Sequence, residues 1–417
     1  MASHTIQRSQ NTNFNDNYVH TEQHTESSGV NKDFCRDVQS LVEWAKSYGV
    51  ATELDITWFE GFGRGAMARA DLNVGDVALE IPASIIISEL LVQTTDMYQI
   101  LQMMEGISSE TMMLLWTMKE RHMIGSQFRK YFDNLPKNFN TGLSFGYGAL
   151  MELDGTLLLE ELMQAKQHLR DQYDLIIPGL CEKHPDVFPE DLYSWDCYLW
   201  ACELWYSNSM KILFPDGNLR SCLIPVAGFL NHSLTPHITN YGKLDPATGT
   251  LKFKLSRPCK AGEQCFLSYG NFASSHFLTF YGFVAEGDNP LDGIPIEIDG
   301  DNNERPSTHL VQGAWMSNNH GLFHYGLPSS LLDCLRKDIG NHDLVPNLET
   351  EIDILKNVHD MFNGMAEGVG DEDIADREHE SWDVKLAVKY KTLQRRIMKS
   401  ILDSCEKGIL LVQNQLP

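Results

Sequence analysis

Apolar residues change their spacing several times along the chain, and each change predicts a different type of secondary structure. Over residues 34–48, apolar side chains recur three and four positions apart, which predicts an amphipathic helix that ends at Gly49. Short β-type runs follow at 56–59, at 77–81 and at 85–87. We therefore expect a helix followed by short strands.

Residues from about 95 to 220 return to helical spacing. One predicted helix covers 157–177 and is closed by Pro178-Gly179, and an aromatic-rich one covers 191–210. A stripe of methionine and tryptophan at helical spacing is typical of a packed core, so we interpret these side chains as core.

The β-type pattern resumes beyond Leu223. Residues 249–255 alternate cleanly, and a second predicted strand covers 264–269. A helix is expected at 274–283, with Gly282 near its end.

The composition changes again beyond Asn289, where Pro290, Pro295 and the acidic run 299–303 predict a linker. The helices expected after it are 331–339, 347–365 and 386–405, with an acidic loop at 367–376. The last of these has a basic face, which we interpret as solvated, formed by Lys389, Lys391, Arg395, Arg396 and Lys399.

This order of elements indicates an α+β fold, in which an antiparallel β domain is interrupted by helices and followed by an all-α region. We expect a disordered tail over 1–30, because it is rich in Asn, Thr, Ser, His and Gln. The β domain is assigned to 31–288 and the helical domain to 289–417.

The charge balance bears on the kind of partner. With 33 basic and 57 acidic residues the chain carries a net charge of −24, which repels phosphate backbones and disfavours direct nucleic-acid binding. A basic protein partner, or a loop that carries lysine, fits this sign better. Apolar runs stay shorter than the roughly 18 residues of a membrane span, so no membrane association is expected.

Cysteine usage and the N-terminal composition indicate a compartment. The 9 cysteines include no Cys-x-x-Cys pair, so we expect reduced thiols and no metal site. The tail has no apolar stretch of a signal peptide, and Arg8 is outnumbered there by Asp16, Glu22 and Glu26. A chloroplast location is therefore not supported, and we expect the cytosol or the nucleus.

Three polar islands follow apolar runs and are expected to build one pocket. They are the glycine cluster at 61–65, the pair Asn231-His232, and the run 268–270. Residues 63–68 also match the G-x-G-x-x-A dinucleotide fingerprint. That fingerprint requires a helix to begin inside it, whereas a turn and a strand follow here, so this reading is set aside. On local grounds, a β-turn remains an alternative to a functional role for these glycines.

Taken together, the motifs resemble one known family. The runs FGRGAMARADLNVGDVALEIP, LIPVAGFLNHS, AGEQCFLSYG and YGF, with the helical insertion between the first two, resemble the SET-domain methyltransferases of the Rubisco large-subunit methyltransferase subclass. The resemblance implies a pseudoknotted SET domain, an exception to unknotted topology, and a C-terminal helical substrate-binding domain. It also implies the cofactor S-adenosyl-L-methionine (SAM) and no zinc.

The resemblance assigns roles to named residues. Gly63 and Gly65 would let the backbone approach SAM, and the segment from Asp76 to Ala78 would line its adenosine side. Asn231 and His232 would bond its amino-acid and adenine parts. Tyr269 matches the catalytic tyrosine, and Tyr281 stands where a side chain faces the transferred methyl group.

Two positions depart from the family pattern. Asn208 stands where many relatives have an arginine for the cofactor carboxylate, and Gly228 stands where an aspartate is common. An unreplaced charged pair would cost about 2 kcal/mol of cofactor affinity. Arg64 in the glycine loop is a candidate substitute for the missing charge.

The function that this resemblance implies is SAM-dependent methylation of a lysine in a protein substrate, by a monomer. A histidine acceptor is an alternative, since one branch of the subclass methylates histidine. A catalytically weak SET module that binds a protein partner is a second alternative.

Overall fold

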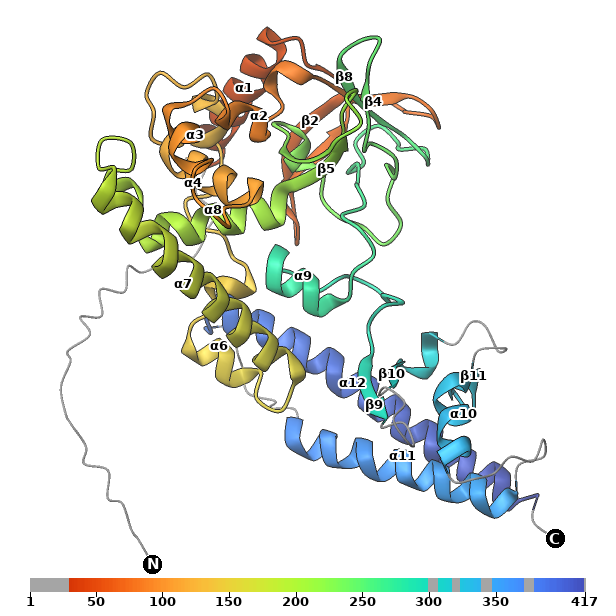
Figure 1. The fold of residues 1–417 in the computed structure, drawn as a ribbon. Helices are drawn as coiled ribbons and strands as arrows, with labels where there is room; N and C mark the ends of the chain where they lie inside the picture. Colours follow the sequence, from red (N-terminus) through yellow and green to blue (C-terminus); the bar gives the residue numbers. More distant parts are fainter. Residues whose placement is uncertain (1–29, 299–306, 317–322, 339–346, 371–378, 416–417) are drawn as a thin grey trace, which may run out of the picture.

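The structure is a computed structural model that describes residues 30–298, 307–316, 323–338, 347–370 and 379–415 (Figure 1). The predicted tail up to residue 29 and the acidic run 299–303 lie outside the described residues. The first elements are α1 (Val30–Ser47), β1 (Ala51–Thr52), β2 (Leu54–Phe59), β3 (Gly63–Ala68) and β4 (Val77–Pro82).

The N-terminal helix and the first strands are confirmed. Helix α1 is followed by Gly49 in the left-handed region, at φ +92°. Strands β2 and β3 form an antiparallel hairpin whose closing pair is Phe59 and Gly63. The glycine-rich run is therefore a strand, which excludes the helix that a dinucleotide fingerprint needs.

The central sheet has four antiparallel strands in the order β1-β4-β8-β7, with β7 at Leu244–Asp245 and β8 at Thr250–Lys254. One predicted strand is wrong: Ala83–Ile85 forms a 3₁₀ turn, and only Ile87 forms a single bridge, to Leu223. All three isoleucines at 85–87 are buried, so an apolar run here reflected burial rather than sheet pairing.

The helical insertion is confirmed and ends earlier than predicted. Its helices are α2 (Glu89–Val92), α3 (Asp96–Leu101), α4 (Ser109–Glu120), α5 (Arg129–Asp133), α6 (Tyr147–Glu152), α7 (Leu157–Lys183) and α8 (Trp195–Asn208). After Asn208 an antiparallel hairpin, β5 (Ser209–Leu213) and β6 (Leu219–Leu223), occupies residues that we had assigned to helix.

The predicted end of the long helix at Pro178-Gly179 is wrong, because α7 continues to Lys183. Proline removes one helical hydrogen bond. Ile177 and Leu180, on either side of Pro178, are only 2% and 3% exposed. Their burial against the core offsets that loss and keeps the last turn helical.

Residues 264–269 do not form the regular strand that we predicted. They make single bridges instead, from Gln264 to Met67 and from Leu267 to both His232 and Ile238, the last two being parallel. The segment lies between β3 and the Asn231-His232 stretch. Its backbone forms isolated hydrogen bonds to both neighbours instead of a continuous ladder to one of them. The predicted helix after it is confirmed as α9 (Ser274–Tyr281), with Gly282 at φ +76°.

The predicted linker contains a strand pair. Strand β9 (Ile294–Ile298) pairs with β10 (Ser307–Val311), and the exposed Pro295 lies between the buried Ile294 and Ile296. A two-stranded ribbon has only edge strands, which tolerate proline. The remaining elements are β11 (Phe323–His324), β12 (Leu327–Pro328), α10 (Ser329–Asp338), α11 (Leu348–Val369) and α12 (Trp382–Gln413).

The three C-terminal helices are confirmed. Helix α11 reaches Val369, so the predicted acidic loop begins inside it and continues, over 371–376, outside the described residues. No described helix is long and apolar enough to cross a bilayer.

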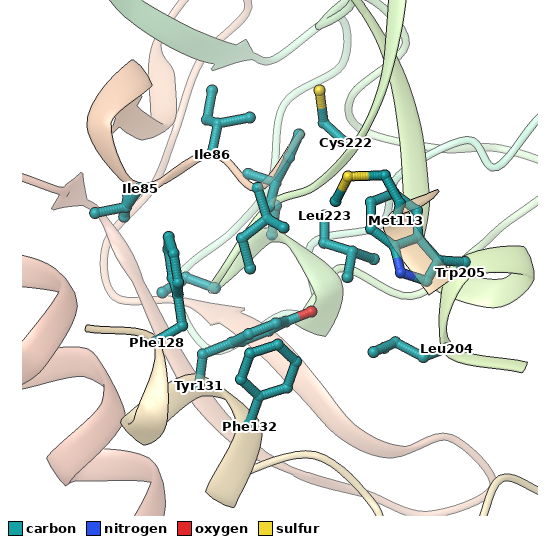
Figure 2. Close-up of a cluster of buried hydrophobic side chains, with 14 of the residues drawn as sticks. Ile85, Ile86, Met113, Phe128, Tyr131, Phe132, Leu204, Trp205, Cys222 and Leu223 are labelled. Atoms are coloured by element: carbon teal, nitrogen blue, oxygen red, sulfur yellow. The ribbon is translucent and has the colours of Figure 1, made fainter. Parts of the chain in front are cut away.

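Buried side chains form three clusters. The main one lies between the sheet and the insertion, and Figure 2 shows part of it, with labelled side chains from Ile85, Ile86, Met113, Phe128, Tyr131, Phe132, Leu204, Trp205, Cys222 and Leu223. A second cluster holds α10, α11 and α12 together. The third joins α12 to α6, α7 and α9, which lie beside it in Figure 1.

The third cluster fixes the C-terminal helices against the insertion. The carboxylate of Asp383 accepts a hydrogen bond from the amide of Gly146 at 2.9 Å, and the rings of Trp382 and Phe145 are 5.7 Å apart. Arg396 of the basic face pairs with Asp288 at 3.1 Å, so that face is not wholly solvated as we had predicted. The domain boundary at 288 stays a prediction.

Candidate functional site

The site begins at strand β3, where Gly65 lets two polar side chains approach the backbone. A Cβ atom at Gly65 would lie 2.6 Å from Nε2 of Gln264 and 3.0 Å from Nδ2 of Asn231. The first distance is shorter than real Cβ contacts and the second is tighter than most of them, so Gln264 in particular can take its position only against a glycine. Gly63, at φ +72°, opens the same strand in a conformation that glycine favours.

Asn231 connects this strand to the segment that carries Tyr269. Its side-chain Nδ2 donates to the carbonyl of Arg64 at 3.0 Å, and its own carbonyl accepts from the amide of Leu267 at 2.8 Å. Asn231 thereby connects Arg64 on β3 to Leu267, although the two are far apart in sequence.

His232 is buried and neutral. Its Nδ1 accepts a hydrogen bond from the amide of Tyr269 at 3.1 Å, so the proton of the neutral ring is on Nε2. Desolvation by burial lowers the pKa of His232 to about 4. Its Nε2 is buried without a hydrogen-bond partner, which leaves one donor of this pocket unsatisfied.

Three tyrosines, Tyr241, Tyr269 and Tyr281, line one cavity, and the ring of Tyr269 lies 5.4 Å from that of His232. The rings of Tyr269 and Tyr281 stack at 5.0 Å, and the hydroxyl of Tyr241 donates to the carbonyl of Ser268 at 3.0 Å. Burial raises the pKa of Tyr269 and raises that of Tyr281 to about 12. The hydroxyl groups are therefore neutral near pH 7 and act as dipoles rather than as bases.

Three adjoining cavities cross the site. The first, which we call the Arg64 cavity, has a volume of about 180 Å³ and is lined by Arg64, Asn134, Asn208 and Gly228 among others. The second, the tyrosine channel, is a constriction of about 30 Å³ that shares Asn208 and Gly228 with the first. The third, the open groove, has about 940 Å³ and shares Tyr241, Tyr269 and Tyr281 with the channel.

The tyrosine channel is uncharged. Its lining consists of Ser207, Asn208, Ser209, Met210, Ala227, Gly228, Leu230, Tyr241, Leu267, Tyr269 and Tyr281. The cavities on its two sides are each lined by at least one cationic side chain, Arg64 in one and lysines in the other.

The Arg64 cavity offers a cation without a carboxylate partner. Arg64 donates to the carbonyl of Asn134 at 2.6 Å, and among the described residues no acidic side chain lies within 4.0 Å of it. Burial lowers the pKa of its guanidinium, although the group stays charged at neutral pH. Oδ1 of Asn134 is buried with no partner, which adds an unused acceptor beside the cation.

The two departures from the family pattern lie in this same cavity. Nδ2 of Asn208 donates to Oγ of Ser207 at 2.7 Å, and a Cβ atom at Gly228 would be 3.1 Å from Oδ1 of Asn208. Arg64 lines the cavity together with both of them, as its suggested role as a substitute requires.

Two predicted site residues lie elsewhere. The carbonyl of Asp76 accepts from the amide of Leu255, and the carbonyl of the fully buried Ala78 accepts from the amide of Glu53. Like Gly63, Gly65, Asn231 and His232, neither of these two residues lines any of the three cavities. Their contact with the adenosine side of a cofactor stays a prediction.

The sequence reading missed several residues of the site. Tyr241 and Met210 line both the channel and the open groove. Met210 belongs to the unpredicted strand β5, and Tyr241 lies ten residues after Asn231 with no motif of its own. Only the hairpin pattern of 209–223 could have indicated Met210.

The structure also gathers three side chains of metal-binding type that the sequence had not connected. His237, Cys259 and Cys265 are buried, with ligand atoms within 4.8 Å of one another. Nδ1 of His237 already accepts from the amide of Phe266 at 3.1 Å, so a proton occupies Nε2 in the neutral ring. Two thiols are fewer than the four ligands of a structural zinc site.

The architecture matches solved structures. The structure of the SET domain of LSMT, the Rubisco methyltransferase, bound to lysine and AdoHcy, aligns with a TM-score of 0.69 and 18% identity over 91% of this chain and 93% of that chain. The chain therefore has the fold of the Rubisco-type SET-domain methyltransferases, as its motifs predicted.

Curated relatives agree with that class, although no family model matches the chain. The [fructose-bisphosphate aldolase]-lysine N-methyltransferase of Arabidopsis thaliana is 25% identical over 67% of this chain and 58% of its own length. The actin-histidine N-methyltransferase of Gallus gallus is 24% identical over 62% of this chain and 44% of its own length. The chain thus spans about half the length of these two relatives, both of which are named as N-methyltransferases.

Proposed function

We propose that this chain is a SAM-dependent protein methyltransferase that acts on a lysine side chain. The observation that carries the proposal is the path from the Arg64 cavity through the tyrosine channel to the open groove, with Tyr269 at the junction. Such a path suits a reaction in which two molecules bind on opposite sides and exchange one small group. The lysine-modifying relative from Arabidopsis thaliana supports the same reaction type.

The residues of the Arg64 cavity suit the amino-acid end of SAM. A carboxylate fits the unpaired guanidinium of Arg64, and an ammonium group fits the unused Oδ1 of Asn134. The unsatisfied Nε2–H of His232 is a donor for a ring nitrogen or hydroxyl. The open face of Gly65 is occupied by the side chains of Gln264, Phe59 and Asn231, so a contact of Gly63 or Gly65 with SAM stays a prediction. When bound, SAM supplies an activated methyl group on a sulfonium.

The side chains of the chain itself have modest roles in this reaction. The uncharged channel removes water from the acceptor amine, which lowers the pKa of the amine and favours its neutral, nucleophilic form. No acidic or basic side chain of the described residues lines the channel, so we expect the departing proton to pass to solvent through the open groove. Alignment of acceptor and methyl group in this narrow neck supplies much of the acceleration.

Tyr269 is the residue we assign to the transfer step. Its neutral hydroxyl oxygen can accept weak C–H···O contacts from a polarised methyl group, each worth about 0.5–1 kcal/mol. The Tyr281 ring stacks on it and limits the space beside the acceptor.

Two measurements test this function. Calorimetric titration with SAM should give saturable binding, and labelled methyl groups should appear in a protein fraction of a cell lysate. The absence of binding at millimolar SAM would overturn the proposal that the chain is an enzyme. It would favour the alternative of a SET module that only binds a partner. If SAM binds and proteins are labelled, mass spectrometry of the labelled proteins would identify the substrate.

A histidine acceptor is the second candidate, and one observation favours it. Four lysines line the open groove, and their positive charge disfavours the approach of a protonated lysine more than that of a neutral imidazole. The actin-histidine relative of Gallus gallus makes this acceptor plausible for the fold. Amino-acid analysis of labelled product separates methyl-lysine from methyl-histidine. The cytosolic or nuclear location is our proposal from the composition of the tail. The relative from Arabidopsis thaliana differs in this respect, because it is named chloroplastic.

A further inference from the structure

The open groove has a charge opposite to that of the whole chain. Its lining includes Lys211, Lys243, Lys252 and Lys254, and among the described residues that line it Asp245 is the one acidic side chain. The chain as a whole carries −24. A concentration of cations at this place, in so acidic a protein, is a local feature that the net charge conceals.

Two of these lysines have no acidic partner. Asp245 pairs with Lys252 at 3.1 Å, and Lys252 also lies 3.6 Å from Glu80. Around Lys243 and Lys254, no carboxylate of the described chain comes within 4.0 Å. Asp245 is therefore already neutralised, and the positive charge of the other two is free to act on a ligand.

The remaining lysine is only loosely paired. Lys211 lies 3.8 Å from Glu110, with the two side chains 62% and 65% exposed. Exposed pairs of this kind contribute little and exchange partners readily. Lys211 is therefore available to a bound ligand as a third cation.

Three of these lysines are held by β-pairing, in two different sheets and at one isolated bridge. Lys211 belongs to β5 and Lys254 to β8, while Lys243 bridges Leu213 just before β7. The same groove is lined by Tyr269 and Tyr281, so the cations flank the exit of the tyrosine channel. A polypeptide that places its acceptor at these tyrosines must lay its neighbouring residues along the lysines.

We propose that the open groove selects protein segments that carry Asp or Glu beside the methyl acceptor. This inference rests on the proposed function for the identity of the acceptor, and it replaces the expectation that an acidic chain prefers a basic partner. Complementary charge at a groove governs both the rate of encounter and the register of binding. Two unpaired cations, each worth a few-fold in an exposed contact, give a preference of about tenfold at low salt.

The test uses three fluorescent peptides that share one central lysine and differ only in flanking residues, which are acidic, neutral or basic. Binding to the full chain is followed by anisotropy, which needs no cofactor, and methyl transfer is measured on the same peptides. We expect the acidic peptide to bind about tenfold more tightly than the neutral one, and the difference to shrink as salt screens the charges. A parallel set with a central histidine covers the second acceptor.

The double variant Lys243→Glu, Lys254→Glu should invert the preference toward the basic peptide. The matched control is Lys46→Glu, Lys183→Glu, which makes the same change in net charge at exposed lysines that do not line the groove. If the glutamate variant fails to fold by circular dichroism, the milder pair Lys243→Gln, Lys254→Gln should still remove the preference.

The outcomes distinguish a failure of the groove inference from a failure of the proposed methyltransferase function. Methyl transfer to all peptides at equal rates, with equal binding, overturns the groove inference and leaves the methyltransferase standing. Charge-selective binding without SAM binding supports the groove and overturns the methyltransferase. Displacement of the acidic peptide by a single-stranded oligonucleotide, at concentrations where an unlabelled acidic peptide has no effect, would assign the groove to nucleic acid and overturn the inference.

Discussion

The backbone amide of Tyr269 donates a hydrogen bond to Nδ1 of His232 at 3.1 Å. This bond joins the two motifs on which the site depends and fixes the neutral ring of His232 with its proton on Nε2. The Tyr269 side chain faces the channel, while His232 leaves a buried donor unsatisfied beside it. A change at either residue is therefore expected to alter the other.

The first prediction concerns the hydroxyl of Tyr269. Tyr269→Phe should lower the rate of methyl transfer at least tenfold, because the preorganised oxygen that faces the polarised methyl group is lost. The affinity for SAM should change less than threefold. Single-turnover transfer of a labelled methyl group, together with calorimetry, measures the two effects separately.

The control for this prediction is Tyr147→Phe, the same change at a side chain that is 79% exposed. It should leave both quantities unaltered. If Tyr269→Phe transfers methyl groups at the rate of the unmodified chain, Tyr269 has no part in the reaction.

The second prediction tests Arg64 as the substitute for the missing family arginine. Arg64→Gln should weaken SAM binding about tenfold to a hundredfold, as expected for the loss of a charged hydrogen bond in a partly buried cavity. Asn208 lines the same cavity, so the double variant Arg64→Gln, Asn208→Arg should recover much of the affinity. Calorimetry measures both.

Arg129→Gln is the control for a general effect of charge, since Arg129 lies on the surface and pairs with Asp133. An affinity that is unchanged in Arg64→Gln would show that the cation does not hold the cofactor. Failure of the double variant alone would leave the role of Arg64 intact and would mean that the two positions are not equivalent.

The sequence predicted the parts of the site that depend on chain order. Asn231-His232 and Tyr269 were expected in one pocket, and the structure brings them within hydrogen-bonding contact. The predicted role of each residue is a separate question that the experiments above address. The packing of Gln264 and Asn231 against Gly65 was not predicted, because on the sequence alone the glycines could equally serve a β-turn.

Other features depend on contacts that no local pattern encodes. Pro178 lies inside a helix because Ile177 and Leu180 are buried around it, and Pro295 lies in a strand because its ribbon has free edges. The lysines of the open groove come from separate segments of the chain, so the net charge of −24 could not reveal that they lie together. Neither local secondary-structure propensity nor total charge predicts features that depend on tertiary contacts.

The third prediction concerns Gly65. Gly65→Ala should lower the free energy of unfolding by about 1–3 kcal/mol, since its Cβ would lie 2.6 Å from Nε2 of Gln264 and 2.7 Å from Cδ2 of Phe59. Combining it with Gln264→Ala should cost less than the sum of the two single changes, because one of the two clashes disappears. Urea denaturation measures the cycle.

Gly125→Ala is the matched control for this cycle, because nothing lies within 4 Å of a Cβ atom placed there. It should change the free energy of unfolding by less than 0.5 kcal/mol, in line with surface substitutions generally. Strict additivity of Gly65→Ala and Gln264→Ala would mean that the strand moves away and that the contact does not hold Gln264 in place.

The last prediction is a loss of stability in mild acid. Burial lowers the pKa of His232 to about 4, and an unfolded chain binds a proton at this residue below about pH 6.5. Between these values the unfolded state carries more protons, so the free energy of unfolding falls as the pH falls, by about 2 kcal/mol for His232 between pH 7 and pH 5. His232→Gln should remove that share, and urea denaturation at the two pH values measures it. Because burial raises the pKa of Glu203 and opposes this trend, the difference between variant and parent is the quantity to compare. An equal loss in both chains would mean that His232 is protonated in the folded state, and that the neutral ring bonded to the Tyr269 amide is not the form present in solution.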